Sequence, residues 1–270
     1  MRNRRSNRGA DRPPAREARP ASGGGERWLY GRHAVAAALA NPERRWRRLT
    51  VLPGQEDEAQ ALAAAARAVR RGDGEPVRVL DRPGFAALLG DDAVHQGLAL
   101  EVEPLEPADL DDVLRAAALA ARAVVVVLDQ VSDPHNVGAI LRAAAAFGAA
   151  AVIVAAHGTP PASGALAKAA SGALDLVPLV PAVNLARALE RLKEAGFWCC
   201  GLDERAEAPL AALDPGPRVA LVLGAEGSGL RRLVRENCDY LARLPTSPAM
   251  PSLNVSTAAA VALYQLAIVG

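Results

Sequence analysis

Short apolar runs along this chain alternate with Ala-rich stretches and with clusters of Gly, Pro, Asp and Asn. The most continuous apolar run, Val124–Leu128, is mostly β-branched and is typical of a parallel strand covered on both faces. The Ala-rich stretches predict helices, because stop signals such as Gly148 follow them. An alternation of strand and helix favours an α/β protein with a parallel sheet.

The elements predicted after residue 123 alternate between strand and helix, except that the strands Phe197–Leu202 and Val219–Leu223 follow each other directly. The predicted strands are Val124–Leu128, Ala151–Ala155, Leu176–Val180, Phe197–Leu202, Val219–Leu223 and Tyr240–Leu244. The predicted helices are Val137–Phe147, Ala162–Ala170, Leu185–Ala195, Leu230–Asn237 and Val255–Val269. The last helix is apolar nearly all round from Ala258, as expected of a helix that is buried or lies at a subunit interface.

A smaller α/β sandwich is predicted ahead of this unit, from about Trp28 to Glu103. Its predicted elements are helices at Gly31–Ala40, Glu56–Arg71 and Phe85–Leu89 and strands at Leu49–Leu52, Val77–Leu80 and Leu98–Val102. Two prolines then indicate a linker, and Asp109 is a candidate N-cap for a helix to about Ala121. We therefore expect a tail at 1–26, domains at 27–103 and 123–270, and a linker with its helix at 104–122.

Charge is unevenly distributed along the chain. Residues 1–20 carry seven arginines and two acidic residues, so that of 31 basic and 30 acidic side chains, residues 21–270 keep 24 and 28, a net charge of −4. The folded part is therefore not a basic protein. The Arg-, Pro- and Gly-rich tail predicts disorder, either as a solvated extension or as an arm for RNA phosphates. Arg44, Arg45, Arg47 and Arg48 around Trp46 predict either an RNA contact or a solvated basic turn with Trp46 tucked inward.

Several classes of protein are disfavoured by the remaining composition. The apolar runs are too short or too interrupted for a membrane span, and no signal peptide is expected. The four histidines lack metal-ligand spacing, so no metal site is expected. Three cysteines form no disulfide framework, and Cys199 and Cys200 in an apolar strand are expected in the core. A cytoplasmic protein is the simplest expectation.

Three motifs combine polar side chains with backbone turns. In the first, Asp133-Pro134-His135-Asn136-Val137-Gly138 follows a strand, which is where open α/β sheets bind ligands. Arg142 comes after it in an otherwise apolar helix, so its guanidinium must meet either an anion or the surface. Asn136 alone is equally typical of a helix N-cap.

The second motif is Leu223-Gly224-Ala225-Glu226-Gly227-Ser228-Gly229, a Gly-rich turn after a strand. Its glycines allow backbone to approach a ligand closely. It matches neither a dinucleotide fingerprint nor a P-loop, and the carboxylate of Glu226 argues against a phosphate ligand.

The third motif runs from Leu244 through a Pro-rich loop to the start of the last helix, where Ser252, Leu253, Asn254 and Ser256 gather. One polar residue there must cap the helix. A cap needs only one such side chain, so the cap does not account for the others.

Taken in this order and spacing, the three motifs resemble those of the SpoU branch of the SPOUT methyltransferases, the TrmH and RlmB group. The resemblance covers about residues 124–270 and includes Lys168–Ala173 between the first two motifs. Residues 28–103 resemble the L30e-like substrate-binding domain of the RlmB type, through Gly31–Val35 and Val94–Leu98. The chain departs from the family at Leu244 and Thr246 and in the Pro-rich loop Ser247–Pro251, which puts the fit of the substrate there in doubt.

This resemblance implies a deep trefoil knot, a homodimer with the site at the subunit interface, and S-adenosylmethionine as the methyl donor. It implies that backbone at Leu223, Gly224, Leu244 and Leu253 holds the donor, and that the functional side chains are Arg142, Asn136, Glu226, Ser252 and Asn254. The expected reaction is 2'-O-methylation of a ribose in RNA, most simply a guanosine of 23S rRNA, because smaller tRNA-modifying members lack the first domain.

Three other functions stay open at this point. The chain could methylate tRNA, or it could be an RNA-binding assembly factor that has the fold without the catalysis. It could also be a nucleotide-binding α/β domain that uses the Gly-rich turn as a phosphate cradle, although the failed fingerprints disfavour this.

Overall fold

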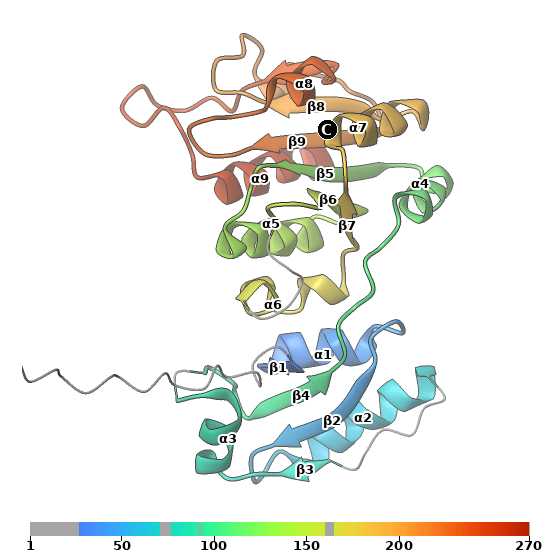
Figure 1. The fold of residues 1–270 in the computed structure, drawn as a ribbon, viewed down its shortest axis with the longest axis vertical. Coiled ribbons are helices and arrows are strands. Elements are labelled where there is room, and N and C mark those ends of the chain that lie inside the picture. The colour runs from blue at the N-terminus through green and yellow to red at the C-terminus, as the bar shows by residue number, and fades with distance from the viewer. Residues whose placement is uncertain (1–26, 71–76, 92, 160–164, 270) are drawn as a thin grey trace, which may run out of the picture.

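The computed structural model describes residues 27–70, 77–91, 93–159 and 165–269. Its strands form two separate sheets, one of four strands and one of six, and each belongs to a different half of the chain. Figure 1 shows the four-stranded sheet below and the six-stranded sheet above, joined by a single extended connection. The predicted tail at 1–26, the last residue of the helix predicted at Glu56–Arg71 and the first three of the helix predicted at Ala162–Ala170 lie outside the described residues.

The N-terminal half is the predicted α/β sandwich. Its sheet has the order β1-β4-β2-β3, in which β4 lies antiparallel to β1 and to β2, and β3 lies parallel to β2. The strands are β1 (Trp28–Tyr30), β2 (Trp46–Val51), β3 (Arg78–Val79) and β4 (Leu98–Val102). The helices are α1 (Arg32–Ala40), α2 (Glu56–Arg70) and α3 (Arg82–Leu89).

The basic segment around Trp46 differs from what its charge predicted. It is not a turn, because β2 begins at Trp46, three residues before the predicted strand. Trp46 is half-buried and packs against the core of this domain, so the predicted inward placement is confirmed. Arg44 is itself buried, although the charge pattern treated it as one of four solvated arginines. Its partner is more than a hundred residues away in sequence, which a local pattern does not show.

The C-terminal half contains the predicted parallel sheet. Its order is β10-β8-β9-β5-β6-β7, and every neighbouring pair is parallel. The strands are β5 (Ala123–Asp129), β6 (Ala151–Ala155), β7 (Leu179–Ala182), β8 (Trp198–Leu202), β9 (Arg218–Gly224) and β10 (Tyr240–Ala242). All seven residues of the central strand β5 are buried, as its continuous apolar sequence predicted.

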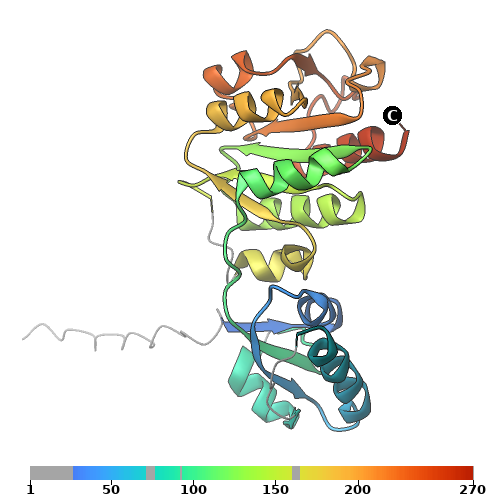
Figure 2. The ribbon, with the colours of Figure 1, turned by 90° about the vertical axis from the view of Figure 1, so that its right-hand side faces the viewer.

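Helices cover both faces of this sheet. They are α4 (Leu110–Leu119), α5 (Pro134–Ala146), α6 (Ala165–Ala170), α7 (Leu185–Glu194), α8 (Arg232–Glu236) and α9 (Val255–Tyr264), which continues as a π-helical turn to Val269. Short 3-10 turns, η2 (Ala173–Asp175) and η3 (Leu210–Ala212), lie in the connections. Figures 1 and 2 show α5 and α9 on one side of the sheet and α4 and α7 on the other.

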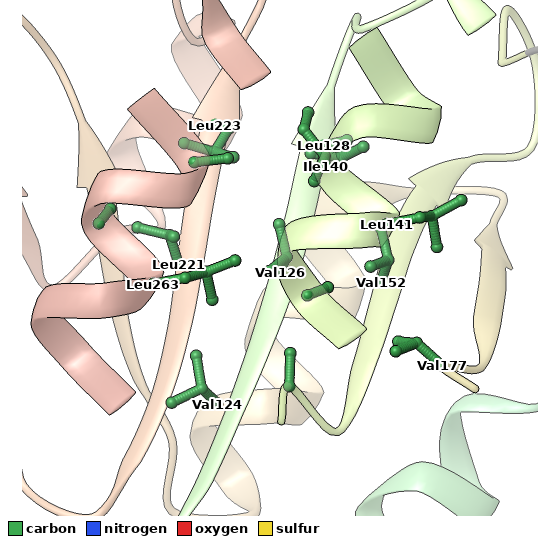
Figure 3. Packing of buried hydrophobic residues seen from close by; sticks show 14 of the residues in the cluster. Val124, Val126, Leu128, Ile140, Leu141, Val152, Val177, Leu221, Leu223 and Leu263 are labelled. Carbon is green, nitrogen blue, oxygen red and sulfur yellow. The ribbon is translucent and has the colours of Figure 1, made fainter. Parts of the chain in front are cut away.

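Each face of the sheet has its own hydrophobic core, because successive side chains of a strand point to opposite faces. Val124, Val126 and Leu128 pack with α5 and α9 in one core, whereas Val125 and Val127 pack with α4 and α7 in the other. Figure 3 shows the first of these cores, in which Ile140 from α5 lies near Leu128 of β5 and Leu263 from α9 lies near Leu221 of β9. The position of α9 beside α5 is therefore fixed by buried apolar contacts.

Several predicted boundaries move in the structure. Asp109 caps α4 as predicted, because its carboxylate accepts a hydrogen bond from the amide of Asp111. The N-cap of α5, however, is Asp133, whose carboxylate accepts from the amide of His135, so Asn136 lies in the first helical turn and is not the cap. The strand predicted at Leu176–Val180 begins at Leu179, because the 3-10 turn η2 precedes it.

No helix within the described ranges has both the length and the apolar character needed to cross a membrane.

The contact between α5 and α6 gives a test of this packing. A Cβ added to Gly138 would lie 2.4 Å from Cβ of Ala169 and 2.7 Å from its carbonyl carbon. We expect Gly138→Ala to lower the free energy of unfolding by about 1–3 kcal/mol, because the two helices would have to separate. Urea denaturation of both proteins measures this. Helix propensity alone predicts a gain in stability of about 1 kcal/mol, and such a gain would contradict the packing described here.

Candidate functional site

The loops that follow β8, β9 and β10 surround one cavity of about 520 Å³. Because these strands are parallel, their carboxyl ends meet at one edge of the sheet, which is where the sequence predicted a ligand crevice. The cavity is lined by residues 202–205, 223–230, 235, 244, 246, 251–255 and 258. Four residues predicted to hold a cofactor are among them, namely Leu223, Gly224, Leu244 and Leu253.

The Gly-rich turn after β9 depends on close contact between backbone segments. The chain folds back on itself so that Gly229 donates its amide hydrogen to the carbonyl oxygen of Ala225, at 2.9 Å. A Cβ on Gly224 would lie 2.3 Å from the carbonyl carbon of Gly229. Only glycine fits at Gly224, so the second motif is a tight backbone loop that forms one wall of the cavity.

An ion pair between a half-exposed arginine and a buried carboxylate holds the exit of this loop. Asp129, at the end of β5, is fully buried and lies beside Gly224 in the sheet. Its carboxylate accepts hydrogen bonds from the backbone amide of Arg231 at 2.8 Å and from Nε of Arg231 at 2.6 Å. This ion pair was not predicted from the sequence. An acidic residue at the end of an otherwise apolar strand could have indicated it, because an unpaired carboxylate in a buried strand would be costly.

Glu226 joins the three motifs. Its Oε1 accepts hydrogen bonds from Nδ2 of Asn254 at 2.6 Å, from the amide of Val255 at 3.3 Å and from Nδ2 of Asn136 at 3.4 Å. Nδ2 of Asn254 also donates to Oδ1 of Asn136, at 3.0 Å. Residues that are 90 and 118 positions apart in sequence thus share one small polar cluster.

Asn254 has two roles in this arrangement. Its Oδ1 accepts from the amides of Ser256 and Thr257, so Asn254 is the N-cap of α9 that the third motif had to contain. Its amide nitrogen is thereby turned toward Glu226 and Asn136. One side chain therefore both begins α9 and ties it to the other two motifs.

The Pro-rich loop between β10 and α9 is closed by a local contact. The hydroxyl of Thr246 donates to the carbonyl oxygen of Pro251, at 2.8 Å. Ser252, predicted as a functional side chain, is exposed in this loop and lines the cavity. Thr246, at which the chain departs from the family, thus supplies the hydroxyl that closes this Pro-rich loop.

Arg142 lies apart from this cluster. It is exposed on α5, six residues after Asn136, which corresponds to about 9 Å along a helix. It does not line the cavity, and no described residue forms a hydrogen bond or an ion pair with it. The sequence predicted that the guanidinium of Arg142 meets either an anion or the surface. In the single chain it lies at the surface.

The cysteines belong to the interior. Burial raises the pKa of the Cys199 thiol to about 12 and that of Cys200 to about 11. Cys238 also has a pKa raised to about 12, by burial first and then by neighbouring groups. Thiols with such values stay protonated and unreactive near neutral pH, which agrees with the predicted core role. Within the described ranges, no group of three or more His, Cys, Asp or Glu is placed to hold a metal ion.

Two models of known protein families match the chain, one in each half. Residues 123–264 match the model of the SpoU rRNA Methylase family. The chain belongs to this family. Residues 28–108 match a second model, described as RNA 2'-O ribose methyltransferase substrate binding, so the N-terminal sandwich is the substrate-binding domain of a methyltransferase.

Curated relatives cover nearly the whole chain. The chain is 41% identical over 242 residues to the 23S rRNA (guanosine-2'-O-)-methyltransferase RlmB of Pseudomonas syringae pv. tomato, covering 88% of this chain and 93% of that protein. It is 36% identical to the enzyme of the same name from Escherichia coli K12, covering 88% and 96%. Among solved structures, an rRNA methyltransferase from Sinorhizobium meliloti has the same fold, with a TM-score of 0.71 at 22% identity over 90% of this chain and 87% of that one.

Proposed function

We propose that this protein transfers the methyl group of S-adenosylmethionine to the 2'-hydroxyl of a guanosine ribose in 23S rRNA. The observation that carries the proposal is the cavity formed by three backbone loops that the Glu226 cluster holds together. The relatives at 36–41% identity, all named for this reaction, support the substrate. The substrate-binding domain supports rRNA over tRNA, because the resemblance implies that the smaller tRNA-modifying members lack it.

The cavity fits S-adenosylmethionine in size and lining. Its volume of about 520 Å³ lies within the range of small-molecule sites. The side chains of Leu244 and Leu253 offer apolar surface, and Gly224 allows backbone to approach a ligand directly. Glu226 at the rim disfavours a phosphate ligand but tolerates a cationic sulfonium. When bound, this donor supplies an electrophilic methyl group.

In the proposed reaction, the protein aligns and polarises the acceptor. The bond that forms joins the ribose 2'-oxygen to the methyl carbon as the bond from that carbon to sulfur breaks. Arg142 binds the neighbouring phosphate, whose oxygen takes the 2'-proton, because a guanidinium stays protonated and is a poor base. Asn136, Ser252 and Asn254 orient the ribose. Glu226 holds their loops, since one of its oxygens already accepts three hydrogen bonds.

A homodimer would bring Arg142 to a cavity. The exposed positions Arg142 and Ala146 of α5 and Thr257, Val261 and Tyr264 of α9 recur at helical spacing, so each helix presents one open face. Val261 is 46% exposed and Tyr264 51% exposed, which is unusual for apolar surface beside a site. We infer that a second copy covers this face in an isologous contact, and that its Arg142 completes the cavity of the first.

The remaining features of the resemblance are also proposals for this chain. We infer a trefoil knot where the chain leaves β10 at the edge of the sheet, passes the cavity and returns to α9 beside α5. We propose the division into a tail at 1–26, a substrate-binding domain at 27–103, a linker with its helix at 104–122 and a catalytic domain at 123–270. A cytoplasmic location follows from the proposed rRNA substrate.

Methyl transfer to RNA tests the function. Purified protein with tritiated S-adenosylmethionine is expected to label 23S rRNA from a strain that lacks the corresponding gene, at one guanosine ribose. Sites of 2'-O-methylation mapped before and after the reaction identify it. Labelling of tRNA alone would support the alternative substrate, and binding of rRNA without any labelling would support the assembly-factor alternative.

Arg142→Ala tests the proposed catalytic group. We expect turnover to fall by at least about a hundredfold, because removal of a preorganised charge at a reacting centre costs this much in other enzymes. The affinity for S-adenosylmethionine should stay nearly unchanged, since the proposed contact of Arg142 is with the RNA phosphate and not with the methyl donor. Single-turnover kinetics and calorimetry on both proteins measure the two effects. Methylation by Arg142→Ala at the normal rate would refute this role.

Val261→Glu tests the proposed dimer. A charge buried in the apolar face of α9 should shift the protein to monomer and reduce methyl transfer, because it would be desolvated without a partner. Light scattering during size-exclusion chromatography measures the mass. Leu119→Glu is the matched control, because Leu119 is 92% exposed on α4 at the other face of the sheet. Equal masses for wild type and Val261→Glu would rule out this interface.

A further inference from the structure

A buried ion pair joins the substrate-binding domain to the catalytic domain. Arg44 precedes β2, and Asp175 is the last residue of η2, in the other half of the chain. Nε of Arg44 lies 2.7 Å from Oδ1 of Asp175, and Nη2 lies 3.0 Å from Oδ2. The side chains are only 5% and 1% exposed. The geometry is bidentate, which fixes the two groups in angle as well as in distance.

The remaining hydrogen-bonding groups of the pair are also satisfied. Nη1 of Arg44 donates to the carbonyl oxygen of Glu103, at 2.9 Å, at the start of the linker between the domains. Nδ2 of Asn41 donates to Oδ1 of Asp175, at 3.1 Å. A buried pair with this many partners contributes little net stability, but removal of one charge leaves the other buried and unpaired. Its contribution is therefore to specify one arrangement of the domains.

The surfaces around the pair are closely packed. Gly172, just before η2, lies against α1, and a Cβ at this position would be 2.9 Å from Cα of Ala34. Gly172 has φ of +92°, which also favours glycine. Ala167 of α6 packs against the core of the N-terminal domain. Figure 2 shows α6 between the two sheets, facing the N-terminal domain. These close contacts surround the ion pair on the side of α1.

Other ion pairs of the N-terminal domain differ from this one. The pairs Arg32–Glu58 and Arg47–Glu103 lie within the domain, and their side chains are between 33% and 60% exposed. Exposed pairs of this kind add little to stability or geometry. The pair Arg44–Asp175 is thus distinguished by being buried, bidentate and shared between the domains.

We propose that Arg44 and Asp175 are positioning residues that hold the substrate-binding domain at one orientation to the methyl-transfer cavity. RNA bound to this domain then presents its ribose to the cavity at a high effective concentration, which a freely swinging domain would lower. The expected effect on KM rests on the proposed function. The fixed orientation of the two domains rests on the interdomain contact alone.

Asp175→Asn tests the proposal in the full-length protein. It keeps the size of the side chain and leaves the guanidinium of Arg44 without its counter-charge. We expect KM for the rRNA substrate to rise about tenfold and kcat to stay within about twofold of the parent. A domain that is no longer held in place lowers the effective concentration of the ribose at the cavity. The affinity for S-adenosylmethionine should not change. Asp112→Asn is the matched control, because Asp112 pairs with Arg115 on the exposed surface of α4.

The orientation itself is measured by pulsed electron paramagnetic resonance. Nitroxide labels at Gln60→Cys on α2 and Leu119→Cys on α4 report the distance between the domains, with unlabelled protein added to suppress contacts between copies. Cys199 and Cys200 are buried and Cys238 is partly buried, and burial raises the pKa of all three thiols, so they should react with the label far more slowly than the two exposed cysteines. We expect one narrow distance distribution in the parent and in Asp112→Asn, and a broad one in Asp175→Asn.

Further variants separate positioning from a loss of folding. Arg44→Lys keeps the charge but not the bidentate geometry, so its KM and its distance distribution should fall between the parent and Asp175→Asn. Gly172→Ala keeps both charges but inserts a methyl group against α1, and it should also broaden the distribution. Narrow distributions and parental KM values in all three variants would overturn the proposal. If the parent transfers no methyl group, the proposed function fails, while the distance measurement still decides the role of the pair.

Discussion

A single carboxylate oxygen, Oε1 of Glu226, receives hydrogen bonds from the first turn of α5 and from the N-terminus of α9, and the rest of the site depends on this contact. Glu226 and Asn254 are exposed, so water weakens these hydrogen bonds in the free chain. Their geometry is set instead by the buried sheet beneath them, in which Gly224 and the Asp129–Arg231 pair fix the course of the loop. In the proposed reaction, substrate and a second subunit would exclude water and strengthen the same contacts.

The architecture separates three tasks among different parts of the molecule. The parallel sheet brings three loops together at its carboxyl edge, the proposed dimer adds Arg142 of a second copy to the cavity, and the N-terminal domain is the substrate-binding domain. Alignment of this kind suits a displacement that needs no covalent intermediate on the protein. A fixed angle between the domains would extend the same principle from the reacting atoms to the whole substrate.

Local sequence patterns predicted most of the fold, because strands such as β5 and caps such as Asp109 are encoded within a few residues. The site motifs were also visible locally, but the resemblance to a family, and not their spacing, indicated that they converge. The sequence did not reveal pairs between distant residues. The alternatives for Arg44 were an RNA contact or a solvated turn, and one alternative for Asn136 was a cap, because Asp175 and Glu226 are far away in the chain. Where long-range partners decide burial, local charge patterns mislead.

Titration calorimetry with S-adenosylmethionine tests most directly whether the three loops form one cofactor pocket. The account predicts one binding event per chain for the wild-type protein and affinity at least about tenfold lower for Glu226→Ala, because loss of hydrogen bonds to a carboxylate costs roughly 1.5–3 kcal/mol. No heat of binding by the folded wild-type protein, with or without RNA, would contradict it.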